Sequence, residues 1–166
     1  FSQAVSIDSI PESCLPDLWA AASEVRDKFK GRQIRLCSIV NAKSGHCAEN
    51  CAFCAQSSHH AAKIKTYDLK RPSDLVRAGR KAFQQGACEF SIVTSGSRIS
   101  EEELKSITRA VGTLAAEGSK AVCASLGMVS ADQLADLRQA GLANFHHNLE
   151  TSPAYFKHIC STHAYD

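Results

Sequence analysis

Segments typical of buried strands alternate with segments typical of amphipathic helices along most of this 166-residue chain. The strand-like segments are short and mostly apolar, whereas the helix-like segments have apolar residues at a helical period and recognisable capping residues. The predicted strands are 34–42, 88–96, 120–127 and 142–150, and the predicted helices that follow them are 71–87, 100–118, 130–141 and 152–159. This alternation predicts a parallel sheet joined by right-handed crossovers.

A parallel sheet of this kind leaves two architectures, an open doubly wound sheet and a closed barrel. No Gly-x-Gly-x-x-Gly sequence follows the first predicted strand, which argues against a dinucleotide-binding doubly wound sheet. We therefore expect an α/β fold, a parallel (β/α) barrel of the TIM type. A complete barrel takes about 250 residues, so the four β/α units make only its first half. Because the chain begins with Phe1 and not Met, we expect it to be part of a longer protein.

A further helix is predicted ahead of the barrel, over 16–30, with Gly31 as its stop signal. We expect residues 1–33 to form an N-terminal segment and helix that pack on the barrel, and residues 34–166 to form the incomplete barrel. In such barrels the chemistry lies at the C-terminal ends of the strands. The loops that follow the four predicted strands should therefore meet at one site.

The loop after the first predicted strand contains three cysteines, Cys47, Cys51 and Cys54, within eight positions. A [4Fe–4S] cluster takes one protein thiolate per iron, so three cysteines leave one iron open. An open iron is a Lewis-acidic and redox-active position that can bind a small chelating ligand. Electron carriers usually ligate every iron. Three cysteines therefore favour a cluster that performs chemistry.

Other interpretations of the cysteines remain open at this point. A structural zinc site needs four ligands, and His46, His59 or His60 would have to supply the fourth. The plainer interpretation is that these histidines are ordinary polar residues of an exposed loop. The chain has eight cysteines, enough for four disulfides, but it is long enough for an apolar core and does not need them.

Composition excludes several functional classes. The formal charge is only +2 and the basic residues are scattered, so no nucleic-acid footprint is visible. No apolar run approaches the about 20 residues that span a membrane. The first ten residues lack the pattern of a secretory signal. These features and the free thiols favour the reducing cytoplasm.

The cysteine spacing resembles the signature of the radical S-adenosylmethionine (radical SAM) enzymes, including an aromatic residue just before the last cysteine. The motif reads Cys47-Ala-Glu-Asn-Cys51-Ala-Phe53-Cys54 here. The resemblance implies that the open iron binds the amino and carboxylate groups of S-adenosylmethionine. One-electron reduction of the sulfonium then yields a 5′-deoxyadenosyl radical, which abstracts hydrogen from the substrate.

Longer stretches resemble the biotin synthase family within this superfamily. They are CSIVNAKSGHCAENCAFCAQSSHH, FSIVTSG, CASLG and GLANFHHNLETSP, and the likeness covers about residues 16–166. It implies that Phe53 lies near the adenine of the bound cofactor and that Asn148 and Glu150 reach the ribose hydroxyls and the substrate. Two residues apart on a strand, Asn148 and Glu150 would face the same side. Without the resemblance, Glu150 would be a charge at a helix start.

The same family carries an auxiliary iron–sulfur cluster, [2Fe–2S] or a variant, deep in the barrel. The resemblance implies that Cys123 is one of its ligands. A familiar form of the family has cysteine where this chain has Ser91, and Cys37 is an extra thiol that would compensate from a neighbouring strand. From the residues alone, a buried strand cysteine is usually a small hydrophobe.

The resemblance further implies an enzyme that converts dethiobiotin to biotin by inserting sulfur, with a flavodoxin- or ferredoxin-type electron donor and a homodimeric state. We expect the present chain to be inactive alone, because half a barrel exposes a sheet edge and an apolar face. Two alternatives stay open. One is a sibling with the same barrel, of the hydrogenase-maturase or methylornithine-synthase type. The other is a metal-binding module with a structural zinc or an electron-carrier cluster.

Overall fold

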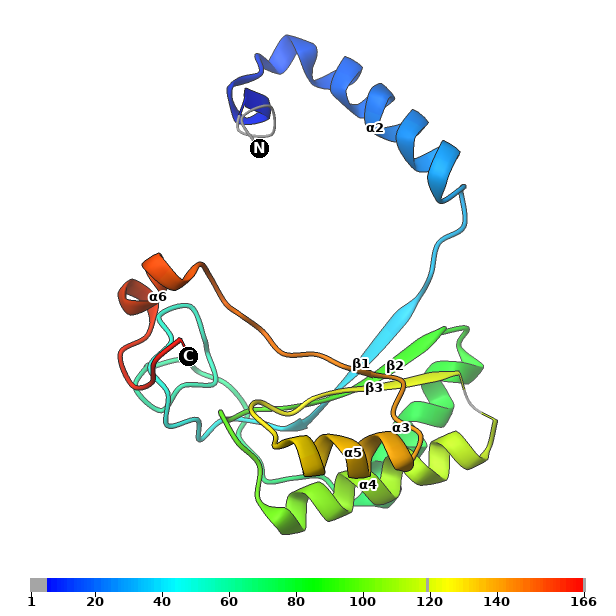
Figure 1. Ribbon diagram of the computed structural model, residues 1–166, viewed down its shortest axis with the longest axis vertical. Helices are drawn as coiled ribbons and strands as arrows, with labels where there is room; N and C mark the ends of the chain where they lie inside the picture. Colours follow the sequence, from blue (N-terminus) through cyan, green and yellow to red (C-terminus); the bar gives the residue numbers. More distant parts are fainter. Residues whose placement is uncertain (1–5, 119, 166) are drawn as a thin grey trace. The chain divides into compact units, whose positions relative to one another are not determined.

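The computed structural model describes residues 6–118 and 120–165 of the chain (Figure 1). It divides into two compact units, Phe1–Arg35 and Leu36–Asp166. The first unit contains the 3-10 helices Ser6–Ser9 and Glu12–Cys14 and the helix α2, Leu15–Phe29. The helix predicted over 16–30 is therefore confirmed. No helix in the described part of the chain is long and apolar enough to cross a membrane.

The second unit is built on a four-stranded parallel sheet in the order β1-β2-β3-β4. Because each strand pairs with the next one in the sequence, the crossovers progress in one direction, as they do in a (β/α) barrel. The predicted parallel α/β architecture is confirmed. The strands are β1, Cys37–Lys43; β2, Glu89–Thr94; β3, Ala121–Ser125; and β4, Asn144–Phe145.

Three helices cover one face of this sheet and bury the core against it (Figure 1). The strand residues that face them alternate with residues on the other face, so Phe90, Ile92, Val122 and Ala124 all lie in the core. A fourth helix, α6, follows the last strand. The helices of this unit are α3, Pro72–Gln84; α4, Glu101–Ala116; α5, Ala131–Gln139; and α6, Pro153–Ile159.

The strand predicted over 142–150 is wrong beyond Phe145. Only Asn144 and Phe145 pair with β3, and the following residues up to α6 form no regular element. His146 N–H still donates to the Ala124 carbonyl of β3 at 2.8 Å, but within the described residues β4 has no strand on its other side. The first strand also starts later than predicted, at Cys37.

The helix starts follow the capping signals of the sequence. Ser100 and Glu103 form a capping box at the start of α4, in which each side chain bonds the backbone N–H of the other residue. Ser130 and Gln133 do the same for α5. These caps end the loops that follow β2 and β3 at defined residues.

A β-bulge displaces the end of β1 just before the cysteine loop. The register with β2 shifts between Asn41 and Lys43, and Ala42 is fully buried there. A bulge bends its strand and redirects the side chains beyond it. Lys43 Nζ then reaches Glu103 Oε1 of α4 at 2.7 Å. This ion pair fixes the end of β1 to the helix that follows β2.

Glu103→Gln is expected to destabilise the fold by roughly 1 kcal/mol at pH 7, since glutamine keeps the capping box but loses the ion pair with Lys43. Burial opposes ionisation of Glu103, but the hydrogen bonds from Lys43 and Ser100 outweigh it and lower the pKa below 4.5. The contribution is therefore complete above about pH 4.5 and is lost as the pH falls through the lowered pKa. Urea denaturation of wild type and variant at pH 7 and about pH 3 measures it.

Glu102→Gln is the matched control, because Glu102 lies in the same first turn and is exposed. It loses the same helix-dipole interaction but no ion pair with Lys43. Equal destabilisation by both variants at pH 7 would contradict the assigned role of the Lys43–Glu103 pair.

Candidate metal and cofactor site

The cysteine loop folds back on itself through backbone hydrogen bonds. Cys47 N–H donates to the Gln56 carbonyl at 3.1 Å, and Ser58 N–H donates to the Cys47 carbonyl at 2.8 Å. Cys54 N–H donates to the Cys51 carbonyl at 3.0 Å, which closes a tight turn between these two cysteines. The bonds hold three thiols on one short loop without any disulfide among the described cysteines.

The histidines near the cysteines brace the loop. His59 Nε2 lies 2.9 Å from the Ala48 carbonyl and His60 Nε2 lies 3.0 Å from the Cys51 carbonyl, so both rings donate to loop backbone. His46 is exposed and has a left-handed backbone, φ 56°. In this structure the rings of His59 and His60 are thus engaged by carbonyl groups of the loop.

A cavity of about 360 Å³ lies at the C-terminal ends of the strands. The thiols of Cys47, Cys51 and Cys54 line one wall, and Asn148 and Glu150 belong to another. The remaining walls come from the loops after β2 and β3 and from the segment after α6. Five of the sequence-predicted site residues thus meet at the edge where a (β/α) barrel places its chemistry.

The environment of Cys51 fits a cationic metal centre. Burial raises the pKa of the Cys51 thiol to about 12, and the neighbouring Cys160, Cys54 and Glu150 groups raise it further. A thiol in such a place stays protonated unless a positive charge stabilises the thiolate. An iron–sulfur cluster supplies that charge through its irons. The donor set therefore fits the cluster that the spacing predicts.

Asn148 and Glu150 reach the cavity from a loop and not from a strand. Glu150 has a left-handed backbone, φ 64°, so the expected same-side alternation along a strand does not apply. A non-glycine residue in this region is uncommon and deserves a functional explanation. Glu150 and Cys51 line the same cavity, and the carboxylate contributes to the raised pKa of the thiol.

Phe53, Cys37 and Cys123 do not line this cavity. Phe53 is 61% exposed. Cys123 is fully buried and accepts a hydrogen bond from Asn144 Nδ2 at 3.5 Å, on the sheet face opposite the helices. The register places Ser91 directly beside Cys123.

Cys37 lies two residues along β1 from the row that contains Cys123. The register pairs Ser91 with Ile39, whereas Cys37 pairs with Glu89 and its thiol donates to Glu89 Oε2 at 3.6 Å. Ser91 Oγ is buried and has no hydrogen-bond partner in the described part of the chain. A buried hydroxyl without a partner, next to a buried thiol, suggests that a polar group binds there. This favours Ser91 and Cys123 over Cys37 as the place of such a group.

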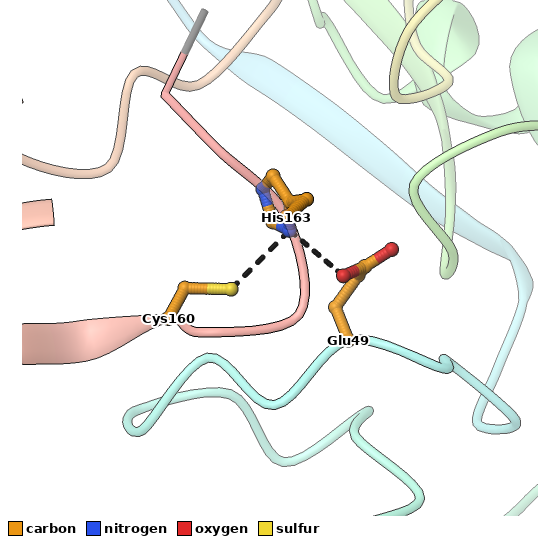
Figure 2. A group of neighbouring side chains, drawn as sticks. All are labelled: Glu49, Cys160 and His163. Carbon is orange, nitrogen blue, oxygen red and sulfur yellow. Dashed lines mark hydrogen bonds and ion pairs between the residues drawn. The ribbon is translucent and has the colours of Figure 1, made fainter. Parts of the chain in front are cut away.

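Sequence reasoning missed a group of side chains beside the cysteines, formed by Glu49, Cys160 and His163 (Figure 2). His163 Nδ1 lies 2.7 Å from Glu49 Oε2 and 3.2 Å from Cys160 Sγ. Hydrogen bonds from Thr162, Ser97 and His163 lower the pKa of Glu49 to about 2. The signals were faint, because Cys160 has no motif around it and His163 lies 114 positions from Glu49.

Comparison with known proteins defines the class first. The family model of the Radical SAM superfamily matches residues 42–166, and the chain belongs to that superfamily. The chain is 47% identical over 165 residues to a biotin synthase of Trichlorobacter lovleyi, covering 99% of this chain and 50% of the relative. It is 44% identical over 164 residues to a biotin synthase of Nitratidesulfovibrio vulgaris, covering 99% and 45%. The resemblance to biotin synthases is confirmed, and the chain spans about half the length of these relatives.

Two solved structures share the fold. A methylornithine synthase superposes with a TM-score of 0.78 at 18% identity, over 94% of this chain and 45% of that one. A maturase of the [FeFe]-hydrogenase superposes with a TM-score of 0.67 at 13% identity, over 94% and 35%. Both likenesses confirm the expected α/β architecture, a partial barrel.

Proposed function

We propose that this chain is the N-terminal half of a biotin synthase, a radical SAM enzyme that inserts sulfur into dethiobiotin. The observation that supports it most is the convergence of Cys47, Cys51 and Cys54 on one cavity, in a chain 47% identical to a biotin synthase. The C–H bonds of an unactivated carbon chain have no acidic proton. A reaction at such carbons needs a radical, which acid–base side chains do not supply.

In this proposal Cys47, Cys51 and Cys54 would hold a [4Fe–4S] cluster and leave it one position for S-adenosylmethionine. When bound, the cluster and S-adenosylmethionine would supply one-electron radical chemistry. Asn148 and Glu150 would bind the ribose hydroxyls and the substrate, because carboxylate and amide oxygens accept from hydroxyl groups. Both residues line the cavity. Phe53, exposed in this chain, would contact the adenine side only from the rim.

The auxiliary cluster would lie on the sheet face opposite the helices, with Cys123 as a ligand. The buried and unpartnered Ser91 hydroxyl beside it supports a polar group there. We also propose Cys37 as a further ligand. It would have to reach the cluster across β2, because it does not lie in the same row of paired residues as Ser91 and Cys123. An electron donor of the flavodoxin or ferredoxin type, a homodimer and a cytoplasmic location complete the proposal.

Anaerobic reconstitution of the full-length protein with iron and sulfide tests this function. We expect a brown protein whose visible absorbance changes with S-adenosylmethionine, and reductant-dependent formation of 5′-deoxyadenosine and biotin from dethiobiotin. Release of 5′-deoxyadenosine without consumption of dethiobiotin would indicate a sibling enzyme of the same barrel. A colourless protein with bound zinc would contradict the radical function.

The 166-residue chain alone serves as the comparison in the same assay, and we expect no 5′-deoxyadenosine from it. Within the described residues, β1 and β4 each pair with one neighbour only. Ile39 on β1 is 68% exposed, and Leu36 just before it is 53% exposed. Open strand edges and exposed apolar side chains favour aggregation.

A further inference from the structure

The segment after α6 is hydrogen-bonded to the cysteine loop along four consecutive loop positions. Ala52 N–H donates to the Ile159 carbonyl at 2.8 Å, and Asn50 N–H donates to Thr162 Oγ1 at 3.1 Å. Asn50 also exchanges two bonds with Ser161, at 2.8 and 2.9 Å. The two segments lie side by side near the C-terminus of the chain (Figure 1). The cysteine loop is thus docked on a second segment around Cys51.

The Glu49 carboxylate is the strongest part of this docking. Its Oε2 accepts from Thr162 Oγ1 at 2.5 Å and from His163 Nδ1 at 2.7 Å. The Ser97 side chain, from the loop after β2, also bonds the carboxylate. Only 15% of the Glu49 side chain and 31% of the His163 side chain are exposed. Bonds to a partly buried carboxylate are charge-assisted and stronger than neutral ones.

Cys160 connects this carboxylate to the metal-binding wall. The residue is 4% exposed, and its thiol lies 3.2 Å from His163 Nδ1 and 3.4 Å from Thr162 Oγ1. The same thiol adjoins Cys51 and helps to raise the pKa of that cysteine. The His163 N–H is shared between Glu49 and the Cys160 sulfur (Figure 2). Cys160 is therefore held by Thr162 and His163, the same two residues that hold Glu49.

Glu49, Cys160 and His163 also have the chemistry of metal ligands, and their donor atoms lie within 4.8 Å of one another. Their spacing favours hydrogen bonding instead. The 2.7 Å separation of nitrogen and oxygen is that of a charge-assisted hydrogen bond, and the same Oε2 atom already accepts from Thr162. The polar atoms of the three residues are hydrogen-bonded to protein groups and need no metal ion as a partner.

We propose that Glu49, Thr162 and His163 form a clamp, called here the Glu49 clamp, that positions Cys51 for its metal before the metal binds. The clamp fixes the loop between Cys47 and Cys51 to the segment after α6, and α6 itself follows the loop that carries Asn148 and Glu150. Ordering a loop costs conformational entropy, and a loop that is already ordered binds with higher affinity. These three are positioning residues, and the inference rests on the proposed function only for the identity of the metal group.

Hydrogen exchange of the metal-free, full-length protein tests the clamp directly. We expect His163→Ala to speed exchange of the Asn50 and Ala52 amides at least about tenfold, because their partners lie on the released segment. After reconstitution, cluster retention against a chelator should fall by about 10- to 100-fold, the usual effect of losing a group that orients metal ligands. His163→Asn, whose amide N–H replaces the Nδ1 donor, should restore most of both.

His158→Ala is the matched control, since His158 is an exposed histidine on α6 that packs on Tyr155 and not on the cysteine loop. Unchanged Asn50 and Ala52 exchange in His163→Ala, or equal cluster retention in His163→Ala and His158→Ala, would overturn the clamp. So would a general loss of protection in His163→Ala that His163→Asn does not reverse. Intact protection in a protein that does not convert dethiobiotin would instead refute the proposed function and leave the clamp standing.

Discussion

Cys51→Ala is expected to abolish stable cluster binding in the full-length protein and, with it, the cleavage of S-adenosylmethionine. The variant removes one of three thiolates, and the two that remain cannot hold a cluster that already has an open iron. The loss should exceed the about 10- to 100-fold that follows removal of a group that only orients ligands. Iron content, visible absorbance and 5′-deoxyadenosine formation after anaerobic reconstitution measure it.

Cys88→Ala controls for the loss of a thiol as such. Cys88 is half-buried just before β2 and is not among the residues that line the cavity. We expect this variant to bind the same amount of iron as the wild type. If Cys51→Ala retained the cluster while Cys88→Ala lost it, the assignment of the cysteine loop as the cluster site would be wrong.

The fold was largely predictable because its determinants are local. The capping boxes at Ser100 and Ser130 and the apolar strands each mark an element within a few residues. The exception is β4, for which the sequence predicted a strand up to Glu150. Sheet formation needs a partner as well as a suitable segment, and β4 has one on a single side among the described residues. Only the tertiary structure reveals that limit.

The candidate site was predictable only where its residues share a motif. The spacing of the three cysteines places them together on any fold, so Cys51 needed no tertiary information. Glu49 and His163 meet across 114 positions, and neither residue type has a spacing rule that pairs it with the other. The predicted partnership of Cys37 with Cys123 depended on strand register. Cys37 lies two residues along β1 from the residue in the row of Cys123, and this offset separates the two thiols.

Gly127→Ala is expected to destabilise the protein by about 3 kcal/mol, and to raise the KM for S-adenosylmethionine. Gly127 follows β3 in the cavity wall with φ 71°, where a side chain costs roughly 1–2 kcal/mol. A Cβ atom there would lie 2.4 Å from the Ser97 carbonyl oxygen. That oxygen accepts from Met128 N–H at 2.8 Å, so the backbone of two cavity loops would have to move. Displacing packed backbone adds about 1–3 kcal/mol. Urea denaturation and steady-state kinetics of the full-length protein measure both effects.

Gly118→Ala separates the two causes. Gly118 has nearly the same backbone, φ 65°, but an added Cβ would meet nothing within 4 Å. It should therefore lose only the roughly 1–2 kcal/mol of backbone strain and leave the KM unchanged. Equal losses of stability in the two variants would mean that the loops after β2 and β3 do not touch at Gly127. The cavity would then lack the fixed wall that must face the three thiols for a cofactor to bind between them.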